Sequence, residues 1–266
     1  MNNGIWRLLN CITPVILTFN EAPNISRVLD RLSWANDIVV VDSHSQDGTQ
    51  EIVSQYPNTR IFERCFDNHA SQWNFALSET GIRSEWILAL DADHTMTEDL
   101  IREISDLTPE EEVSGFRIAF DYCVLGRCLR ASLYPPLISM YRRERAHYVQ
   151  QGHTQRVVVQ GAIRTLRSHM LHDDRKSFGR WIKSQNQYMR LEAELVRQAS
   201  WADSSWPGRL RKLVLPAPVA VFLWCLVVKR AILDGIPGIY YTAQRTLAEC
   251  ILSLHLVVQL LRWPRA

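Results

Sequence analysis

The first hundred residues alternate short apolar runs with stretches in which apolar residues recur at helical spacing. The apolar runs lie at 14–19, 37–42, 60–63 and 86–90. Their short length and β-branched content predict buried strands of the kind found in parallel sheets. Between the first two runs, Ile25, Val28, Leu29 and Leu32 fall on one face of a helix with Pro23 in its first turn. This alternation predicts an α/β fold with a mostly parallel sheet, right-handed crossovers and flanking helices.

The pattern loosens after residue 110 but still predicts regular elements. Strands are expected at 115–122, 137–142 and 156–159, an amphipathic helix at 176–200, and a linker at 201–208. Earlier in the chain, one helix is expected after the polar turn 43–49 and through Val53, and another at 70–80. A third is expected to begin at Thr97, which would cap it and is followed by acids in the first turn. We therefore expect the first domain to span 1–203.

The remaining segment, 204–266, is predicted to be a basic, apolar helical tail. Residues 213–228 carry no charge, and as a helix they would be about 24 Å long, short of the roughly 30 Å hydrocarbon layer. The net charge is −4 over 1–203 (22 Lys/Arg, 26 Asp/Glu) and +6 over 204–266 (8 and 2). This asymmetry predicts a tail that attaches to an anionic membrane surface without crossing it. The alternative is a tail docked on its own domain.

The six cysteines form no CxxC pair, and the chain runs into its first strand without a secretory signal. Reduced thiols in the cytosol are therefore the default expectation, although Cys123 and Cys128 are close enough to pair across a hairpin.

The sequence Asp91-Ala92-Asp93 ends the fourth predicted strand, and Asp42 ends the second. In an open α/β sheet, ligands bind at the carboxyl ends of such strands. Two carboxylates in this position suit Mg²⁺ or Mn²⁺ carrying a diphosphate. The alternative is a pair of surface aspartates that cap the following helix.

Four motifs occur in a characteristic order: Thr18-Phe19-Asn20-Glu21, the segment 39–49, Gln72-Trp73-Asn74, and Asp91-Ala92-Asp93. As a set they resemble the family 2 glycosyltransferases, which have a GT-A fold and use nucleotide-diphosphate sugars. The resemblance covers residues 13 to about 110. It implies a nucleotide-sugar half at about 13–110 and an acceptor half at about 111–203. Further segments are similar to bacterial enzymes that build lipopolysaccharide core and envelope glycans: 142–143, 172–176, 181–188 and 233–238.

The resemblance implies roles for individual residues. Thr18, Asn20 and Glu21 would meet the ribose or base, and Asp42 would accept a hydrogen bond from uracil. Asp91 would face the ribose or the metal, and Asp93 would coordinate Mg²⁺ or Mn²⁺. For Asn20 and Glu21, a helix N-cap and a first-turn acid are the competing interpretations.

Inverting transfer also requires a general base with a pKa near the working pH. Where relatives place an acid, this chain has Gln151-Gly152-His153-Thr154, and no carboxylate lies between Glu144 and Asp173. His153 is therefore the first candidate, with Asp173 and Asp174 as rivals. His94 follows the two aspartates at a position that is often acidic in relatives.

The sequence thus predicts an inverting, metal-dependent glycosyltransferase at the cytoplasmic face of the bacterial inner membrane. Its donor would be a nucleotide-diphosphate sugar, with a UDP-linked sugar expected, and its acceptor a lipid-linked or lipopolysaccharide glycan. No nucleic-acid partner is expected. The alternatives are a polyprenyl-phosphate glycosyltransferase and a catalytically idle membrane scaffold of the same fold.

Overall fold

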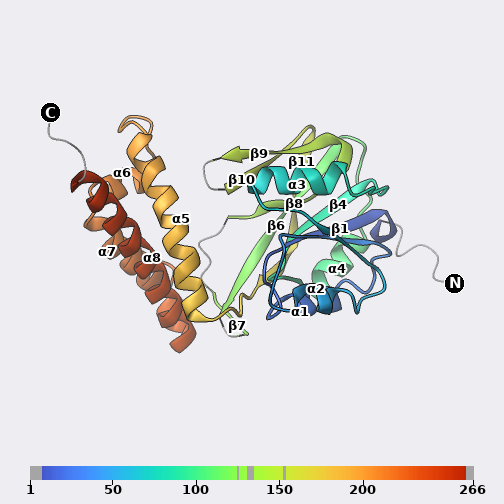
Figure 1. The fold of residues 1–266 in the computed structure, drawn as a ribbon, viewed down its shortest axis with the longest axis horizontal. Coiled ribbons are helices and arrows are strands. Elements are labelled where there is room, and N and C mark those ends of the chain that lie inside the picture. Colours follow the sequence, from blue (N-terminus) through green and yellow to red (C-terminus); the bar gives the residue numbers. More distant parts are fainter. Residues whose placement is uncertain (1–7, 125, 131–134, 152–153, 262–266) are drawn as a thin grey trace. The chain divides into compact units, whose positions relative to one another are not determined.

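The computed structural model describes residues 8–124, 126–130, 135–151 and 154–261 (Figure 1). The chain forms two compact units. The sheet unit comprises Met1–Cys128 and Ser132–Arg175, and the helical unit comprises Leu129–Ala131 and Lys176–Ala266. Helix α5 (Phe178–Gln198), which we expected within the first domain, belongs to the helical unit.

The sheet unit is built on one large sheet, in the order β3-β2-β1-β4-β8-β6-β11-β5, with β7 paired to β6. Its strands are β1 (Ile12–Thr18), β2 (Ile38–Asp42), β3 (Thr59–Glu63), β4 (Trp86–Asp91), β5 (His94–Met96), β6 (Val113–Val124), β7 (Arg127–Cys128), β8 (Leu137–Arg142) and β11 (Ala162–His172). β3, β2, β1 and β4 are mutually parallel, as the alternating pattern predicts. β8 runs antiparallel to both β4 and β6, and β5 antiparallel to β11. The sheet is therefore mixed rather than mostly parallel.

Helices cover both faces of this sheet. They are α1 (Ile25–Asp30), α2 (Thr49–Val53), α3 (His69–Ser78) and α4 (Glu98–Ser105), with the short turns η1 (Leu9–Cys11) and η2 (Arg143–Arg145). In β2, Val40 packs in a core with α1 and α4, whereas Val39 and Val41 pack in a second core with α3. Because successive side chains of a strand point to opposite faces, a strand covered on both faces has an unbroken apolar run.

A separate antiparallel ribbon, β9 (Ala146–Gln151) and β10 (Thr154–Val159), lies beside α3. The side chain of Asn74 fixes it by donating to the carbonyl of Tyr148 and accepting from its backbone N–H. Trp73 stacks on the Tyr148 ring with 5.2 Å between the ring centroids. The motif Gln72-Trp73-Asn74 therefore joins α3 to the ribbon.

The hairpin of β6 and β7 carries a disulfide between Cys123 and Cys128. This pairing was foreseen as possible, but it corrects the default expectation that all thiols are reduced. Cys11, Cys65, Cys225 and Cys250 form no disulfide within the described part of the chain.

The helical unit contains α5, α6 (Trp206–Lys212), α7 (Pro216–Leu223), the turns η3 (Trp224–Val228) and η4 (Ala231–Asp234), and α8 (Ile236–Leu261). Ala193 and Val196 of α5 pack against Leu252 and Leu256 of α8. At the start of α8, a Cβ on Gly238 would lie 1.8 Å from the carbonyl oxygen of Ala231, so only glycine permits this close approach. Within the described residues, no helix combines the length and apolar character needed to span a bilayer.

An ion-pair cluster joins three helices of this unit. Arg211 of α6 donates to both carboxylate oxygens of Glu249 in α8, and it also bonds Glu192 of α5. Glu249 is only 3% exposed. A carboxylate so thoroughly removed from water depends on its guanidinium partner, and the reverse also holds.

We therefore expect Glu249→Ala to destabilise the protein by roughly 3–5 kcal/mol, since it leaves Arg211 partly buried with one partner fewer. The matched control is Glu110→Ala, which breaks the exposed pair with Arg164 and should cost about 0–1 kcal/mol. Equilibrium urea unfolding of the full chain measures both. Equal losses of unfolding free energy in the two variants would show that the buried cluster stabilises the protein no more than an exposed pair does.

Candidate active site

The carboxyl ends of β1, β2 and β4 lie side by side at one edge of the sheet. The pairing places Thr18 opposite Asp42, and Leu17 opposite Asp91. Residues that are far apart in the sequence are thus brought to a common edge, the usual ligand position in such folds. The structure places Thr18, Asp42 and Asp91 where the sequence predicted them.

Asp42 is buried and fully engaged by hydrogen bonds within the protein. One oxygen accepts from the hydroxyls of Thr18 and Ser45, and the other accepts from the backbone N–H of Ser45 and the amide of Gln50. A carboxylate offers about four acceptor directions, so none is left for a base. These bonds lower its pKa against the opposing effect of burial. In this geometry Asp42 holds the 43–50 loop, and its predicted contact with uracil is not tested.

Asn20 and Glu21 also join the first two loops of the sheet. The backbone N–H of Asn20 donates to Ser45, and its side-chain oxygen accepts from the N–H of Gln46. The backbone N–H of Glu21 donates to Thr49. Asn20 has a φ of 56°, a left-handed conformation that asparagine tolerates, and the N-cap of α1 is Asn24. The N-cap interpretation of Asn20 is therefore wrong, and its contacts with a nucleotide remain a prediction.

Asp93 lies beside two histidines in a group that can hold a metal ion. Ligand atoms of Asp93, His94 and His172 all lie within 4.8 Å of one another. The closest contact joins Asp93 to the Nε2 of His172 at 3.2 Å, whereas the Nε2 of His94 is 3.8 Å from Asp93. Carboxylate and imidazole ligands together suit Mn²⁺ and its neighbours better than they suit Mg²⁺.

His94 is less suited to bind a metal than its position suggests. Its Nδ1 accepts a hydrogen bond from the backbone N–H of Asp91, which places the proton of the neutral ring on Nε2. Burial lowers the pKa of His94, although Asp91 and Asp93 act in the opposite direction. A neutral ring with a protonated Nε2 has no lone pair for a cation, so Asp93 and His172 are the better ligand pair.

His172 was not among the metal ligands predicted from the sequence, and it is the second residue of the candidate pair. β11 carries it to the site through pairing that sets His172 opposite His94 of β5 and Tyr122 of β6. The available signal was its position in His-Asp-Asp-Arg-Lys, the segment 172–176. Local periodicity gave no indication that this segment returns to Asp93.

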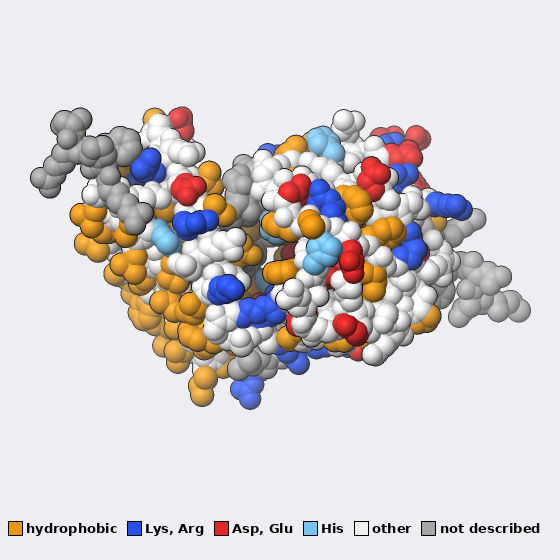
Figure 2. All heavy atoms as spheres, viewed as in Figure 1, with side chains coloured by type: hydrophobic (Ala, Val, Ile, Leu, Met, Phe, Trp, Pro, Cys, Tyr) orange, Lys and Arg blue, Asp and Glu red, His pale blue; other side chains and the backbone are white. Residues whose placement is uncertain are grey.

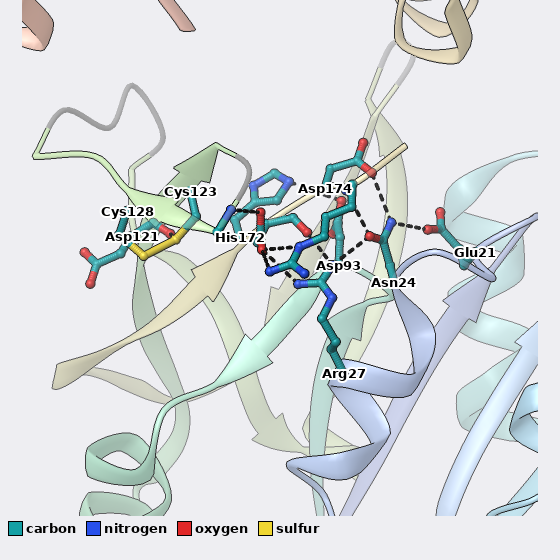
Figure 3. A network of polar contacts seen from close by, with 12 residues as sticks. Glu21, Asn24, Arg27, Asp93, Asp121, Cys123, Cys128, His172 and Asp174 are labelled. Carbon is teal, nitrogen blue, oxygen red and sulfur yellow. Dashed lines mark hydrogen bonds and ion pairs between the residues drawn. A yellow bond between two sulfur atoms is a disulfide. The ribbon is translucent and has the colours of Figure 1, made fainter. Parts of the chain in front are cut away.

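The residues after His172 belong to a polar network with α1 (Figure 3). Asp173 is buried and accepts from Arg27 and Arg175, and also from the backbone N–H of Gly126. Its own N–H donates to the carbonyl of Asp93. These contacts make Asp173 an anchor between α1 and the metal group, which argues against its predicted role as a base.

Asp174 has a different environment from Asp173. It accepts a hydrogen bond from Asn24, whose side chain also donates to Glu21 (Figure 3). Its role as a base stays a prediction. His153 lies outside the described residues, so its role also remains untested.

A cavity of about 370 Å³ borders Asp91 and His94. Aromatic and aliphatic side chains form much of its wall, including Trp73, Phe120 and Tyr148. The edge of the sheet therefore combines a polar loop region, a candidate metal group and an adjoining pocket.

Comparisons with known proteins agree with this arrangement. The family model for glycosyl transferase family 2 matches residues 13–170, and the chain belongs to that family. It is 25% identical over 226 residues, 78% of each chain, to the lipopolysaccharide core biosynthesis glycosyltransferase LpsC of Rhizobium meliloti. An uncharacterized glycosyltransferase of Rickettsia bellii is 33% identical over 94 residues, 35% of this chain and 31% of the relative.

The fold is similar to that of S. aureus TarS 1-349, solved in complex with UDP-GlcNAc. The TM-score is 0.50 at 13% identity, covering 96% of this chain and 93% of the other. The protein is therefore a glycosyltransferase with a GT-A-like α/β fold, as the motif set indicated.

The Asp93–His172 pair predicts a specific protonation behaviour in metal-free protein. Burial opposes the charged ring, but the charge of Asp93 and its hydrogen bond raise the pKa of His172 above its ordinary value. The pair thus stabilises the fold below about pH 6.5, and this contribution is lost as pH rises through the raised pKa. NMR titration should show His172 titrating above free imidazole, and Asp93→Asn should lower the midpoint. An unchanged midpoint in that variant would exclude the pairing.

Proposed function

We propose that this protein is an inverting glycosyltransferase that uses a UDP-linked sugar and a divalent cation, Mg²⁺ or Mn²⁺. Its acceptor is a lipid-linked or lipopolysaccharide-type glycan at the cytoplasmic membrane face. The observation that carries the proposal is the approach of Asp93 and His172 at the carboxyl edge of the sheet. LpsC is named as a lipopolysaccharide core biosynthesis glycosyltransferase, which supports a lipopolysaccharide-type acceptor. TarS was solved with UDP-GlcNAc, which supports a UDP-linked donor.

Asp93 and His172 would hold the cation. When bound, such a cation neutralises the charge that develops on a departing diphosphate, a Lewis-acid contribution worth several kcal/mol. The protein's own part is to keep both ligands fixed: the carboxyl end of β4 leads into Asp93, and the Asp173 anchor follows directly on His172. Prior fixation means that little reorganisation is needed when the donor binds.

A base must also take the proton of the acceptor hydroxyl. We propose His153 for this role, with Asp174 as the rival. Asp173 is the weaker candidate, because two guanidinium groups and a backbone N–H already occupy its carboxylate.

Substitution of the ligand pair tests the metal proposal. Asp93→Asn and His172→Ala should each lower turnover of UDP-sugars by about 10²–10³-fold, the kinetic equivalent of the lost Lewis-acid contribution. The matched control is His169→Ala, which removes a half-exposed histidine of the same strand that is paired with Asp121. It should change turnover less than threefold or so. Full activity of either ligand variant, or of the wild type in excess EDTA, would refute the assignment.

The helical unit carries the surface that supports membrane attachment. Large apolar side chains are exposed along α7, η3, η4 and α8, and Figure 2 shows many hydrophobic side chains gathered in this part of the molecule. Leu215 is 79% exposed and Ile236 is 83% exposed. Soluble monomers rarely expose contiguous apolar patches of more than a few hundred Å². We propose that this apolar surface enters the interfacial layer of the bilayer.

The charge of the same unit supports an anionic lipid partner over a second copy of the chain. Lys229 and Arg230 follow η3 directly, and Arg209 and Lys212 precede α7. Within the described residues from 204 onward, the acids are Asp234 and Glu249, and both already contact arginines. Anionic headgroups stabilise nearby Lys and Arg by about 1 kcal/mol each, whereas two copies of a basic face repel each other.

Vesicle flotation tests this surface. The full chain should bind phosphatidylglycerol vesicles more tightly than phosphatidylcholine vesicles. The double variant Leu215→Asp, Val219→Asp should lose binding, because charges would enter the apolar layer. Phe66→Asp changes an exposed residue of the sheet unit and is the matched control. Retained vesicle binding by the double variant would contradict the proposal, and so would a stable dimer that does not bind vesicles.

A further inference from the structure

The cavity beside Asp91 and His94 lies on the acceptor side of the sheet. Its wall comes from β4, β5, β6, β8, β9, β10 and β11, together with Trp73 of α3. Among the described residues, none from β1, β2 or β3 lines it. The cavity thus adjoins the edge that we assign to the nucleotide, because the end of β4 with Asp91 belongs to both. A second substrate bound there would lie next to the candidate metal group.

The polar groups of this cavity are mainly hydrogen-bond donors. Arg117 of β6 and Arg156 of β10 line it, and Gln155 lies beside them. The lining contains one acid, Asp91, at the end that faces the metal group. A ligand with acceptor atoms would match the donors of Arg117, Arg156 and Gln155.

Arg117 and Arg156 differ from most arginines of the sheet unit. Among the described residues, nine others form ion pairs within the unit, for example Arg27 with Asp173, Arg60 with Asp37 and Arg142 with Glu85. Across the described ranges, neither Arg117 nor Arg156 has a carboxylate within ion-pair distance. Two uncompensated guanidinium groups around one pocket leave it with an excess of positive charge.

We propose that this cavity binds an anionic substituent of the acceptor glycan, a phosphate or a carboxylate, through Arg117 and Arg156. Guanidinium groups match both anions with paired hydrogen bonds, which a neutral hydroxyl cannot equal. The inference rests on the proposed function, because it assigns a charge to the acceptor of that reaction.

Binding of small sugars to the full chain tests the charge preference directly. The probes are mannose 6-phosphate with mannose, and glucuronate with glucose, each pair differing in one anionic group. Calorimetric titrations in the presence of UDP and Mn²⁺ should show at least one anionic sugar binding about tenfold or more tightly than its neutral partner. The phosphate and carboxylate arms show which anion the pocket accepts.

Variants then locate the anion. Arg117→Gln and Arg156→Gln should each lower the affinity for the anionic sugar by about tenfold to a hundredfold. The affinity for the neutral sugar should change little, so most of the charge preference is lost. Arg102→Gln is the matched control, because it removes an exposed arginine of α4 that lies outside the cavity. Affinity for UDP should stay unchanged in all three variants, which also confirms that they fold.

Two results would overturn the proposal: equal binding of charged and neutral sugars, or a charge preference that survives both cavity variants. The titrations are repeated without UDP, so the cavity is tested even if the nucleotide does not bind. Failure of UDP binding would count against the proposed donor, whereas loss of the charge preference with intact UDP binding would count only against this cavity.

Discussion

The architecture depends on a parallel block of strands that is covered on both faces. Because β1, β2 and β4 are buried above and below, polar side chains can project only where the strands end. The parallel register brings those ends to one edge, so Thr18, Asp42 and Asp91 become neighbours. Burial of apolar surface thus decides where the polar chemistry collects.

Internal hydrogen bonds then make that edge rigid. Asp42, Asn20 and Glu21 bind the first two loops to each other. Asp173 joins α1 to the segment that carries His172. Asp42, Asn20 and Glu21 thus support the loops of this edge, and their contacts with a nucleotide stay predictions. A fixed edge of this kind suits catalysis, since its dipoles are oriented before the donor arrives.

The helical unit, unlike the sheet unit, buries few of its large apolar side chains. Its core is small, with Ala193, Val196, Leu252 and Leu256, and a buried ion-pair cluster joins its helices. Many of its large apolar side chains are exposed instead of buried. Such a composition is costly in water and favourable at a lipid interface. The proposed contact with a membrane would account for the uncharged stretch at 213–228.

The sequence by itself determined the parallel strands, the flanking helices and the position of Asp91 and Asp93, because apolar periodicity and strand-end acids are local signals. It also predicted strands at 115–122, 137–142 and 156–159, but not their antiparallel pairing. Nor did it determine the return of β11, which places His172 beside Asp93. It also did not show that Asp42 is saturated or that Asp173 is an anchor. Those facts depend on contacts between residues far apart in the chain, and only the tertiary structure sets such contacts.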